Sequence, residues 1–269
     1  MYQRNNFTLD NNLKVQFNNF LNNNKLKDKS LKKKLVKNYL IKNNHFFIYD
    51  LKINSKREFE SKLKKVCKLF GKPVKQNLKK ETIVKIKPKK TNRLSLQNRL
   101  RYHQTNTGGS IHTDGPQLFT TPKYLIMGCF TQSRNGGDTV IVNGKKIFNE
   151  FNIITQKILK SNFYFERRGF GKKILKKPVF QITKKNFIFR YLREYLIKAY
   201  DLKKIRIDIE KSKALNDLDK SLNKTKNQIK FKLKKKQIIV INNHICAHGR
   251  KKFIIEKNTP RLLYRLWAR

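Results

Sequence analysis

The chain has 269 residues, 38% of them hydrophobic, so it is long enough for one large domain or two small ones around a filled core. Its 65 Lys and Arg against 17 Asp and Glu give a formal net charge of +48, which favours polyanions and acidic small molecules as partners. The basic residues form no single stripe, and no zinc-finger, RNA-recognition or basic-zipper pattern occurs. The joint excess of Lys, Asn, Ile and Phe also fits drift in an AT-rich genome, so nucleic-acid binding is left open without a motif to support it.

The cysteines and the N-terminus bear on the compartment. Cys67, Cys129 and Cys246 lie far apart and form no Cys-x-x-Cys pair, so neither a disulfide framework nor a zinc knuckle is expected. The first residues, MYQRNNFTLDNN, lack the apolar core of a secretion signal, and no apolar run approaches the roughly 20 residues that span a bilayer. We expect a cytoplasmic protein with no membrane association.

The first part of the chain predicts a helix, a strand and a second helix. Residues 30–42 place aliphatic side chains near a helical period, and the apolar run HFFIYDLKI at 45–53 indicates a buried strand. Ser55 and Glu58 match a capping box, and Gly71 is a stop signal for the helix that follows them.

The rest of the chain alternates between strand and helix patterns. A short strand is expected at 81–87, and the polar segment 91–110 is interpreted as a surface loop. The remaining predicted elements are strands at 123–130, 137–142, 178–182, 186–191, 237–243 and 261–269, and helices at 144–159, 193–202 and 213–224.

Strands in both halves with helices between them indicate an α+β chain with a mainly β core. A barrel or sandwich that carries flanking and inserted helices satisfies this pattern. Because the sequence contains no repeat and no long linker, we expect a single domain over residues 1–269, with residues 1–44 as an N-terminal helical lead-in.

The segment GGSIHTDGPQ, residues 108–117, places His112 and Asp114 two residues apart. On a strand, side chains two apart point to the same face, so an imidazole and a carboxylate can meet at one point. A non-heme Fe(II) oxygenase site uses two histidines and one carboxylate and keeps positions open for a cosubstrate and O2, so a second histidine must come from elsewhere. Taken alone, the pattern is more typical of a solvated turn.

Later motifs change this balance. Thr139 follows within GGDT, His248 lies within HGR after an apolar strand, and Arg261 and Arg265 lie four residues apart in the last predicted strand. In this order the motifs resemble the taurine dioxygenase family of Fe(II)/2-oxoglutarate-dependent oxygenases, which includes clavaminate-synthase-like enzymes. The resemblance runs from about residue 45 to the C-terminus, and it implies a double-stranded β-helix, or jelly roll.

The resemblance also assigns roles to residues of this chain. Thr139 and Arg261 match the positions that hold the far carboxylate of 2-oxoglutarate, and a planar guanidinium suits that carboxylate better than a lysine does. Arg265, two strand periods beyond Arg261, is expected to face the same cavity and to bind an anionic group of the substrate. The resemblance implies that the catalytic metal ligands are His112, Asp114 and His248.

Other polar residues compete for these roles. His244 is the rival of His248, because both would share a face of a straight strand; we interpret His244 as a loop-end histidine or one that supports a ligand. His45 and His103 are interpreted as structural or surface residues, and Asp138 as a turn residue.

Several smaller features have structural interpretations. Gly136 and Gly137 are expected to form a hairpin turn. Arg190 and Arg193 either line a substrate pocket or begin a solvated helix, and the solvated helix is favoured. The cysteines are expected to be small core residues.

The expected function is an Fe(II)/2-oxoglutarate-dependent dioxygenase with O2 as the second cosubstrate. With the carboxylate of Asp114 present, hydroxylation of an unactivated C–H bond is the default reaction, with release of succinate and CO2; desaturation and ring closure share its early steps. The expected substrate is small and anionic, zwitterionic or amino-acid-like. The alternatives are a dioxygenase that modifies nucleic acid or protein, and a non-catalytic basic RNA-associated jelly-roll protein.

Overall fold

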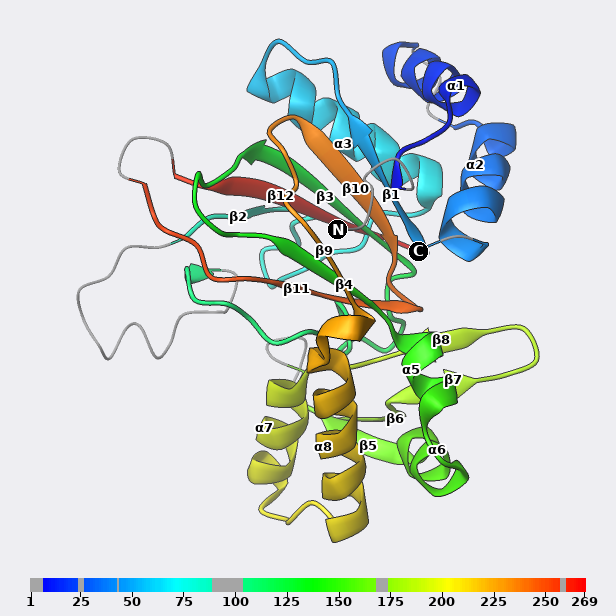
Figure 1. Cartoon of the computed structure of the whole chain (residues 1–269), viewed down its shortest axis with the longest axis vertical. Coiled ribbons are helices and arrows are strands. Elements are labelled where there is room, and N and C mark those ends of the chain that lie inside the picture. The colour runs from blue at the N-terminus through cyan, green and yellow to red at the C-terminus, as the bar shows by residue number, and fades with distance from the viewer. Residues whose placement is uncertain (1–6, 24–26, 43, 89–103, 168–173, 257–259) are drawn as a thin grey trace.

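The structure, a computed structural model, describes residues 7–23, 27–42, 44–88, 104–167, 174–256 and 260–269. Its centre is an antiparallel five-stranded sheet with the strand order β1-β10-β3-β12-β2 (Figure 1). The bounds of these strands are β1 (Phe46–Asp50), β10 (Gln237–Asn242), β3 (Tyr124–Thr131), β12 (Leu262–Ala268) and β2 (Ile83–Ile86). The sheet therefore joins strands from both ends of the chain.

A second antiparallel sheet, with the order β11-β4-β9, lies against one face of the first. Its strands are β11 (Cys246–Arg250), β4 (Thr139–Asn143) and β9 (Gln228–Phe231). Side chains alternate along β10, so Ile239 and Ile241 join Ile141 in the core between the sheets, whereas Ile238 and Val240 face the other way. The two faces of the central sheet thus bury two separate apolar clusters.

Helices near the N-terminus cover the outer face of the central sheet, as Figure 1 shows. They are α1 (Asn11–Asn22), α2 (Lys29–Leu35), the π-helix η2 (Val36–Ile41) and α3 (Lys56–Phe70). Ser55 accepts a hydrogen bond from the amide of Glu58, as the capping pattern predicted. At Gly71, which ends α3, a Cβ would lie 1.7 Å from the carbonyl oxygen of Arg269, so only glycine allows this close approach.

A long insertion between β4 and β9 forms a second lobe, at the bottom of Figure 1. Its apolar cluster, which includes Phe163, Phe180 and Leu215, extends to Val142 and Ala247 of the second sheet. The elements of the insertion are α5 (Gly144–Glu150), α6 (Ile153–Lys160), β5 (Asn162–Phe165), β6 (Leu175–Pro178), β7 (Phe180–Ile182), β8 (Phe187–Phe189), α7 (Arg193–Lys203), α8 (Ile209–Asn223) and the 3-10 turn η4 (Thr225–Asn227).

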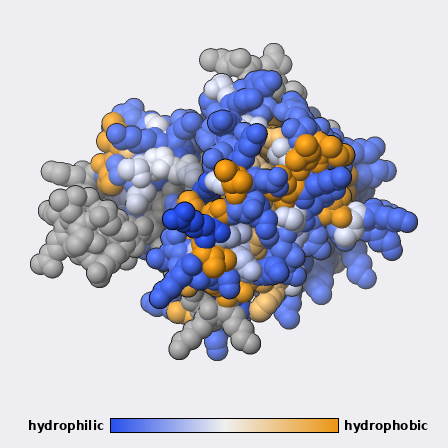
Figure 2. All heavy atoms as spheres, turned by 90° about the horizontal axis from the view of Figure 1, so that it is seen from below, coloured by the Kyte–Doolittle hydropathy of each residue, from blue (hydrophilic) through white to orange (hydrophobic). Residues whose placement is uncertain are grey.

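The molecular surface reflects the composition of the chain. Seen from below, the surface is mostly hydrophilic, and its apolar side chains form separate patches (Figure 2). Exposed apolar side chains of the lower lobe include Ile153, Ile197 and Ile209. Scattered apolar side chains of this kind are normal on a monomer and do not define a binding face.

The chain is thus mixed α and β, with antiparallel sheets and helices on their flanks and between them, as predicted. The helix expected over 144–159 is two helices instead, because the chain turns at Phe151 and Asn152 caps α6 through the amide of Thr155. Most of the loop expected at 91–110 lies outside the described residues, as does His103. None of the described helices is both long and apolar enough to cross a membrane.

Candidate metal centre

Two distant segments bring the predicted histidines together. His112 and His248 exchange backbone hydrogen bonds of 2.9 and 2.7 Å, and so form an antiparallel bridge beside the second sheet. Directly opposed residues point to the same face, and the two imidazole rings lie 4.6 Å apart between centroids. The bridge therefore places the side chains of His112 and His248 on one face, as the two-residue spacing does for His112 and Asp114.

The side chains of His112, Asp114 and His248 form a compact buried cluster. Their candidate ligand atoms lie within 4.8 Å of one another. The Nε2 atoms of the two histidines are each 3.9 Å from an oxygen of Asp114, which is too long for a hydrogen bond and leaves space between the groups. His112 donates from Nδ1 to the carbonyl oxygen of Ser110 at 2.8 Å, so its Nε2 lone pair is turned toward Asp114.

Burial and charge set the protonation state of this cluster. Burial lowers the pKa of His112, and it lowers the pKa of His248 to about 3. Burial alone would raise the pKa of the Asp114 carboxyl, but the positive charge of Arg265 is the largest of several effects that outweigh burial, so that pKa is lowered. Two neutral imidazoles and one carboxylate are the forms that bind a divalent metal ion. The donor set thus fits Fe(II) in a site of two histidines and one carboxylate.

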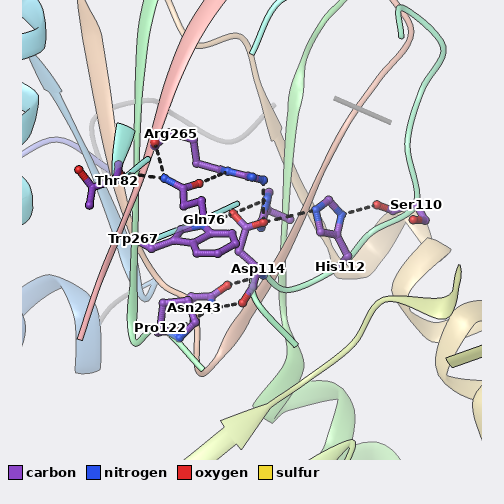
Figure 3. Close-up of polar contacts among 10 residues, drawn as sticks. Gln76, Thr82, Ser110, His112, Asp114, Pro122, Asn243, Arg265 and Trp267 are labelled. Atoms are coloured by element: carbon purple, nitrogen blue, oxygen red, sulfur yellow. Dashed lines mark hydrogen bonds and ion pairs between the residues drawn. The ribbon is translucent and has the colours of Figure 1, made fainter. Parts of the chain in front are cut away.

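Asp114 is held at its side chain and at its backbone, as Figure 3 shows. Arg265 Nη1 donates to Oδ1 and Trp267 Nε1 donates to Oδ2, both at 3.0 Å. The fully buried Asn243 accepts from the Asp114 amide at 2.8 Å and donates to the Asp114 carbonyl at 2.9 Å and the Pro122 carbonyl at 2.8 Å. Asn243 thereby supplies the pairing that a neighbouring strand would otherwise give.

A small pocket adjoins the cluster and contains the other predicted residues. Thr139, at the start of β4, and Arg261, just before β12, are 3% and 4% exposed. Arg261 Nε donates to Gln132 Oε1 at 2.8 Å, which fixes the plane of its guanidinium. The pocket is lined by His112, Thr139, His248, Arg250, Arg261 and Arg265, together with apolar side chains. Its cations give it the chemistry of an anion site.

The competing residues lie elsewhere. His244 is outside the cluster: it lies in the turn between β10 and β11, its Nε2 is 3.2 Å from the carbonyl oxygen of Thr121, and burial lowers its pKa to about 4. His45 contacts the carbonyl oxygen of Leu40. Gly136 and Gly137 have φ angles of 72° and 79°, a left-handed turn that suits glycine.

One interpretation from the sequence was wrong. Arg190 was expected on a solvated helix start, but it is 3% exposed and donates to Thr121 Oγ1 and Gln181 Oε1. Arg193 does begin α7, where it contacts Asn216 and Asp219.

Three residues that support Asp114 were missed. Trp267 lies two residues after Arg265 on the same face of β12, so strand periodicity was a signal that could have found it. Asn243 and Gln76 carried no such signal, because their partners are backbone groups and side chains far away in the chain.

The chain matches the family model described as taurine catabolism dioxygenase TauD, TfdA family over residues 28–267. No curated protein matches it significantly. Among solved structures it is similar to an asparagine oxygenase in complex with Fe(II), 2S,3S-3-hydroxyasparagine and succinate, with a TM-score of 0.72 and 10% identity over 97% of this chain and 92% of that one.

It is also similar to the non-heme iron oxygenase OrfP. The complex of OrfP with Fe and alpha-ketoglutaric acid has a TM-score of 0.71 and 12% identity over 97% of this chain and 93% of that one. The complex of OrfP with Fe, succinate and (3S)-hydroxy-L-Arg has a TM-score of 0.70 and 12% identity over 98% of this chain and 93% of that one. At these identities the likeness shows a shared fold.

Proposed function

Because this chain belongs to the taurine catabolism dioxygenase TauD, TfdA family and is an Fe(II)- and 2-oxoglutarate-dependent oxygenase, we propose that it hydroxylates a small amino-acid-like substrate. In the proposed reaction, 2-oxoglutarate and O2 are consumed, one oxygen atom enters a C–H bond of the substrate, and succinate and CO2 leave. The observation that carries the proposal is the buried His112, Asp114 and His248 cluster beside an arginine-lined pocket.

We assign the iron to His112, Asp114 and His248. The support is chemical: the cluster offers two neutral imidazole nitrogens and an ionised carboxylate, and all three side chains are buried. When bound, the metal supplies, with 2-oxoglutarate and O2, an oxidant able to attack an unactivated C–H bond. The protein's own groups orient the ligands and keep bulk water away.

We assign the far carboxylate of 2-oxoglutarate to Thr139 and Arg261. Both are buried, and both line the pocket next to the two histidines. A guanidinium whose plane is fixed by Gln132 offers paired donors to a carboxylate at a low cost in side-chain entropy. The Thr139 hydroxyl can donate one further hydrogen bond.

We assign an anionic group of the substrate to Arg265. It lines the same pocket, and its side chain is 14% exposed. The similar asparagine oxygenase and OrfP were solved with hydroxyasparagine and hydroxyarginine, which are amino acids. An amino-acid carboxylate beside Arg265 would be consistent with those complexes.

We further propose that the two sheets form a double-stranded β-helix, or jelly roll, within a single domain over residues 1–269. The core shared by both sheets supports this arrangement. A cytoplasmic location is also proposed, and the three buried free cysteines are consistent with it.

A second candidate function is the modification of a substrate carried by a polyanion such as nucleic acid. It is favoured by a cleft of about 530 Å³ between the start of α2 and the end of α3. Among the described residues that line it, the one acid, Asp28, is already used to cap α2. The lysines that line this cleft are Lys27, Lys29, Lys32, Lys68 and Lys72.

The test is succinate formation by the purified protein with Fe(II) and 2-oxoglutarate, with each proteinogenic amino acid added separately. We expect at least one amino acid to increase succinate formation and to gain one oxygen atom, and Asp114→Ala to abolish both. His244→Ala is the matched control, because His244 is close in the fold but outside the cluster. If oligonucleotides stimulate succinate formation and no amino acid does, the second candidate replaces the first.

A further inference from the structure

Gln76 is a buried side chain in the segment between α3 and β2, and it contacts β12. It is 4% exposed. Its Nε2 donates to the carbonyl oxygens of Thr82 at 3.0 Å and Arg265 at 2.8 Å, and its Oε1 accepts from Arg265 Nε at 2.9 Å (Figure 3). The amide therefore makes three hydrogen bonds, two of them to one residue. Buried amides with this many partners have one preferred orientation.

The backbone around Gln76 is fixed as well. The backbone amide of Val74 donates to the carbonyl oxygen of Trp267 at 2.9 Å. The backbone amide of Gln76 donates to the carbonyl oxygen of Glu81 at 2.8 Å. The backbone on both sides of the Gln76 side chain is therefore hydrogen-bonded to neighbouring segments.

Gln76 determines how the guanidinium of Arg265 is placed. Nε is taken by Gln76, Nη1 donates to Asp114, and the guanidinium carbon lies 4.8 Å from the ring centroid of Trp267. Trp267 in turn donates to the second oxygen of Asp114. Among the described residues, Nη2 has no hydrogen-bond partner, and Arg265 lines the pocket that holds Thr139. The remaining edge of the guanidinium is therefore available to a bound anion.

Arg265 has a competing environment on its other side. It also lines a second cleft, together with Gln76, Glu60 and Glu81. Arginine has many rotamers, and these two carboxylates would attract a guanidinium released from its present position, although Lys79 and Lys85 line the same cleft and offset part of their charge. The hydrogen bond from Arg265 Nε to Gln76 selects the orientation that faces Asp114.

We propose that Gln76 is a positioning residue of the metal centre, which holds Arg265 against Asp114 and directs the free guanidinium edge toward the anion bound beside the metal. The inference rests on the proposed function. It assigns no contact between Gln76 and the metal, 2-oxoglutarate or the substrate, because Gln76 acts through Arg265.

The test compares Gln76→Ala with Gln228→Ala in the whole protein. Gln228 is also a buried glutamine, 7% exposed, but it donates to the carbonyl oxygen of Leu222 in the second lobe. The two measurements are the affinity for Co(II), followed by its visible absorption, and the affinity of the Co(II) form for 2-oxoglutarate under anaerobic conditions.

Arg265 is assigned to the substrate, but it also lines the pocket that is assigned to 2-oxoglutarate. A displaced guanidinium attracts this dianion less, so we expect Gln76→Ala to bind 2-oxoglutarate about tenfold more weakly. Its Co(II) affinity should be equal to or higher than that of the wild type, because a mobile Arg265 repels the metal ion less. A structural defect would weaken both affinities together. Gln228→Ala should leave both unchanged. If Gln76→Ala does not fold, Gln76→Leu, which keeps more of the volume, is measured instead.

A double-mutant cycle with Arg265→Leu separates the role of Gln76 from a direct one. If Gln76 acts through Arg265, Gln76→Ala has no further effect on 2-oxoglutarate affinity once Arg265 is leucine. The inference is overturned if Gln76→Ala binds 2-oxoglutarate like the wild type, or loses the same factor in both backgrounds. A folded wild type that binds neither Co(II) nor 2-oxoglutarate overturns the proposed function itself, which is a different outcome.

Discussion

Replacing Asn243 by alanine tests how Asp114 is held in place. The Asn243 side chain makes three buried hydrogen bonds, one to the amide of Asp114 and two to the carbonyl oxygens of Asp114 and Pro122. At about 1 kcal/mol for each bond, Asn243→Ala should lower the free energy of unfolding by about 3 kcal/mol. It should also weaken metal binding, because the backbone that presents the Asp114 carboxylate loses its support.

Asn242→Ala is the matched control. Asn242 is the preceding residue, 4% exposed, and its side chain donates to the carbonyl of Leu40 and accepts from the amide of His244. Urea unfolding should show a loss of about 2 kcal/mol for this variant, from two bonds. Co(II) titration should show weaker binding for Asn243→Ala alone. Equal metal affinities in the two variants would refute the idea that Asn243 positions Asp114.

Three further predictions address charge and burial. Arg261→Lys keeps the positive charge but loses the planar pair of donors, so the affinity for 2-oxoglutarate should fall about tenfold; an unchanged affinity in a titration of the Co(II) form would contradict the assignment of Arg261. Burial lowers the folded-state pKa of His244 to about 4, and the charges of Lys123 and Arg190 add to this effect. As the pH falls below 6.5, the unfolded state therefore binds more protons than the folded state. Stability should therefore decrease by on the order of 2–3 kcal/mol between pH 6.5 and 4, and urea unfolding of His244→Gln should show a correspondingly smaller decrease; identical pH profiles would exclude this role for His244. Burial also raises the pKa of the thiols of Cys67, Cys129 and Cys246, to about 12 for Cys67 and Cys129. A thiol reagent should therefore label the protein only in denaturant. Rapid labelling of the native state would argue against the buried positions of these cysteines.

The residues proposed to carry the chemistry could be picked out from the sequence because Fe(II) takes a defined donor set and because the order of the motifs resembles the taurine dioxygenase family. His112 and Asp114 are close in the chain, and a second histidine was required by the donor set that Fe(II) takes. The structure brings His248 to His112 through a backbone bridge. Both arginines of the last strand were expected on one face, and both line the pocket.

The supporting residues could not be found in this way. Asn243 and Gln76 act on backbone groups and side chains far away in the sequence, and amide side chains are common in loops. Arg190 was misread for a related reason: periodicity describes the element that carries a residue, but Arg190 is buried by Thr121 and Gln181 from other segments. The break between α5 and α6 was missed because Asn152 is a cap signal inside an otherwise helical pattern.

In the proposed site, His112, Asp114 and His248 hold Fe(II) beside a site for 2-oxoglutarate. The most direct test is an anaerobic titration of the protein with Fe(II) and 2-oxoglutarate, followed by the visible charge-transfer band of their chelate. We expect the band to form in the wild type and in His244→Ala, and to be lost or much weaker in His248→Ala. Equal bands in the two histidine variants, or no band in the folded wild type, would contradict it.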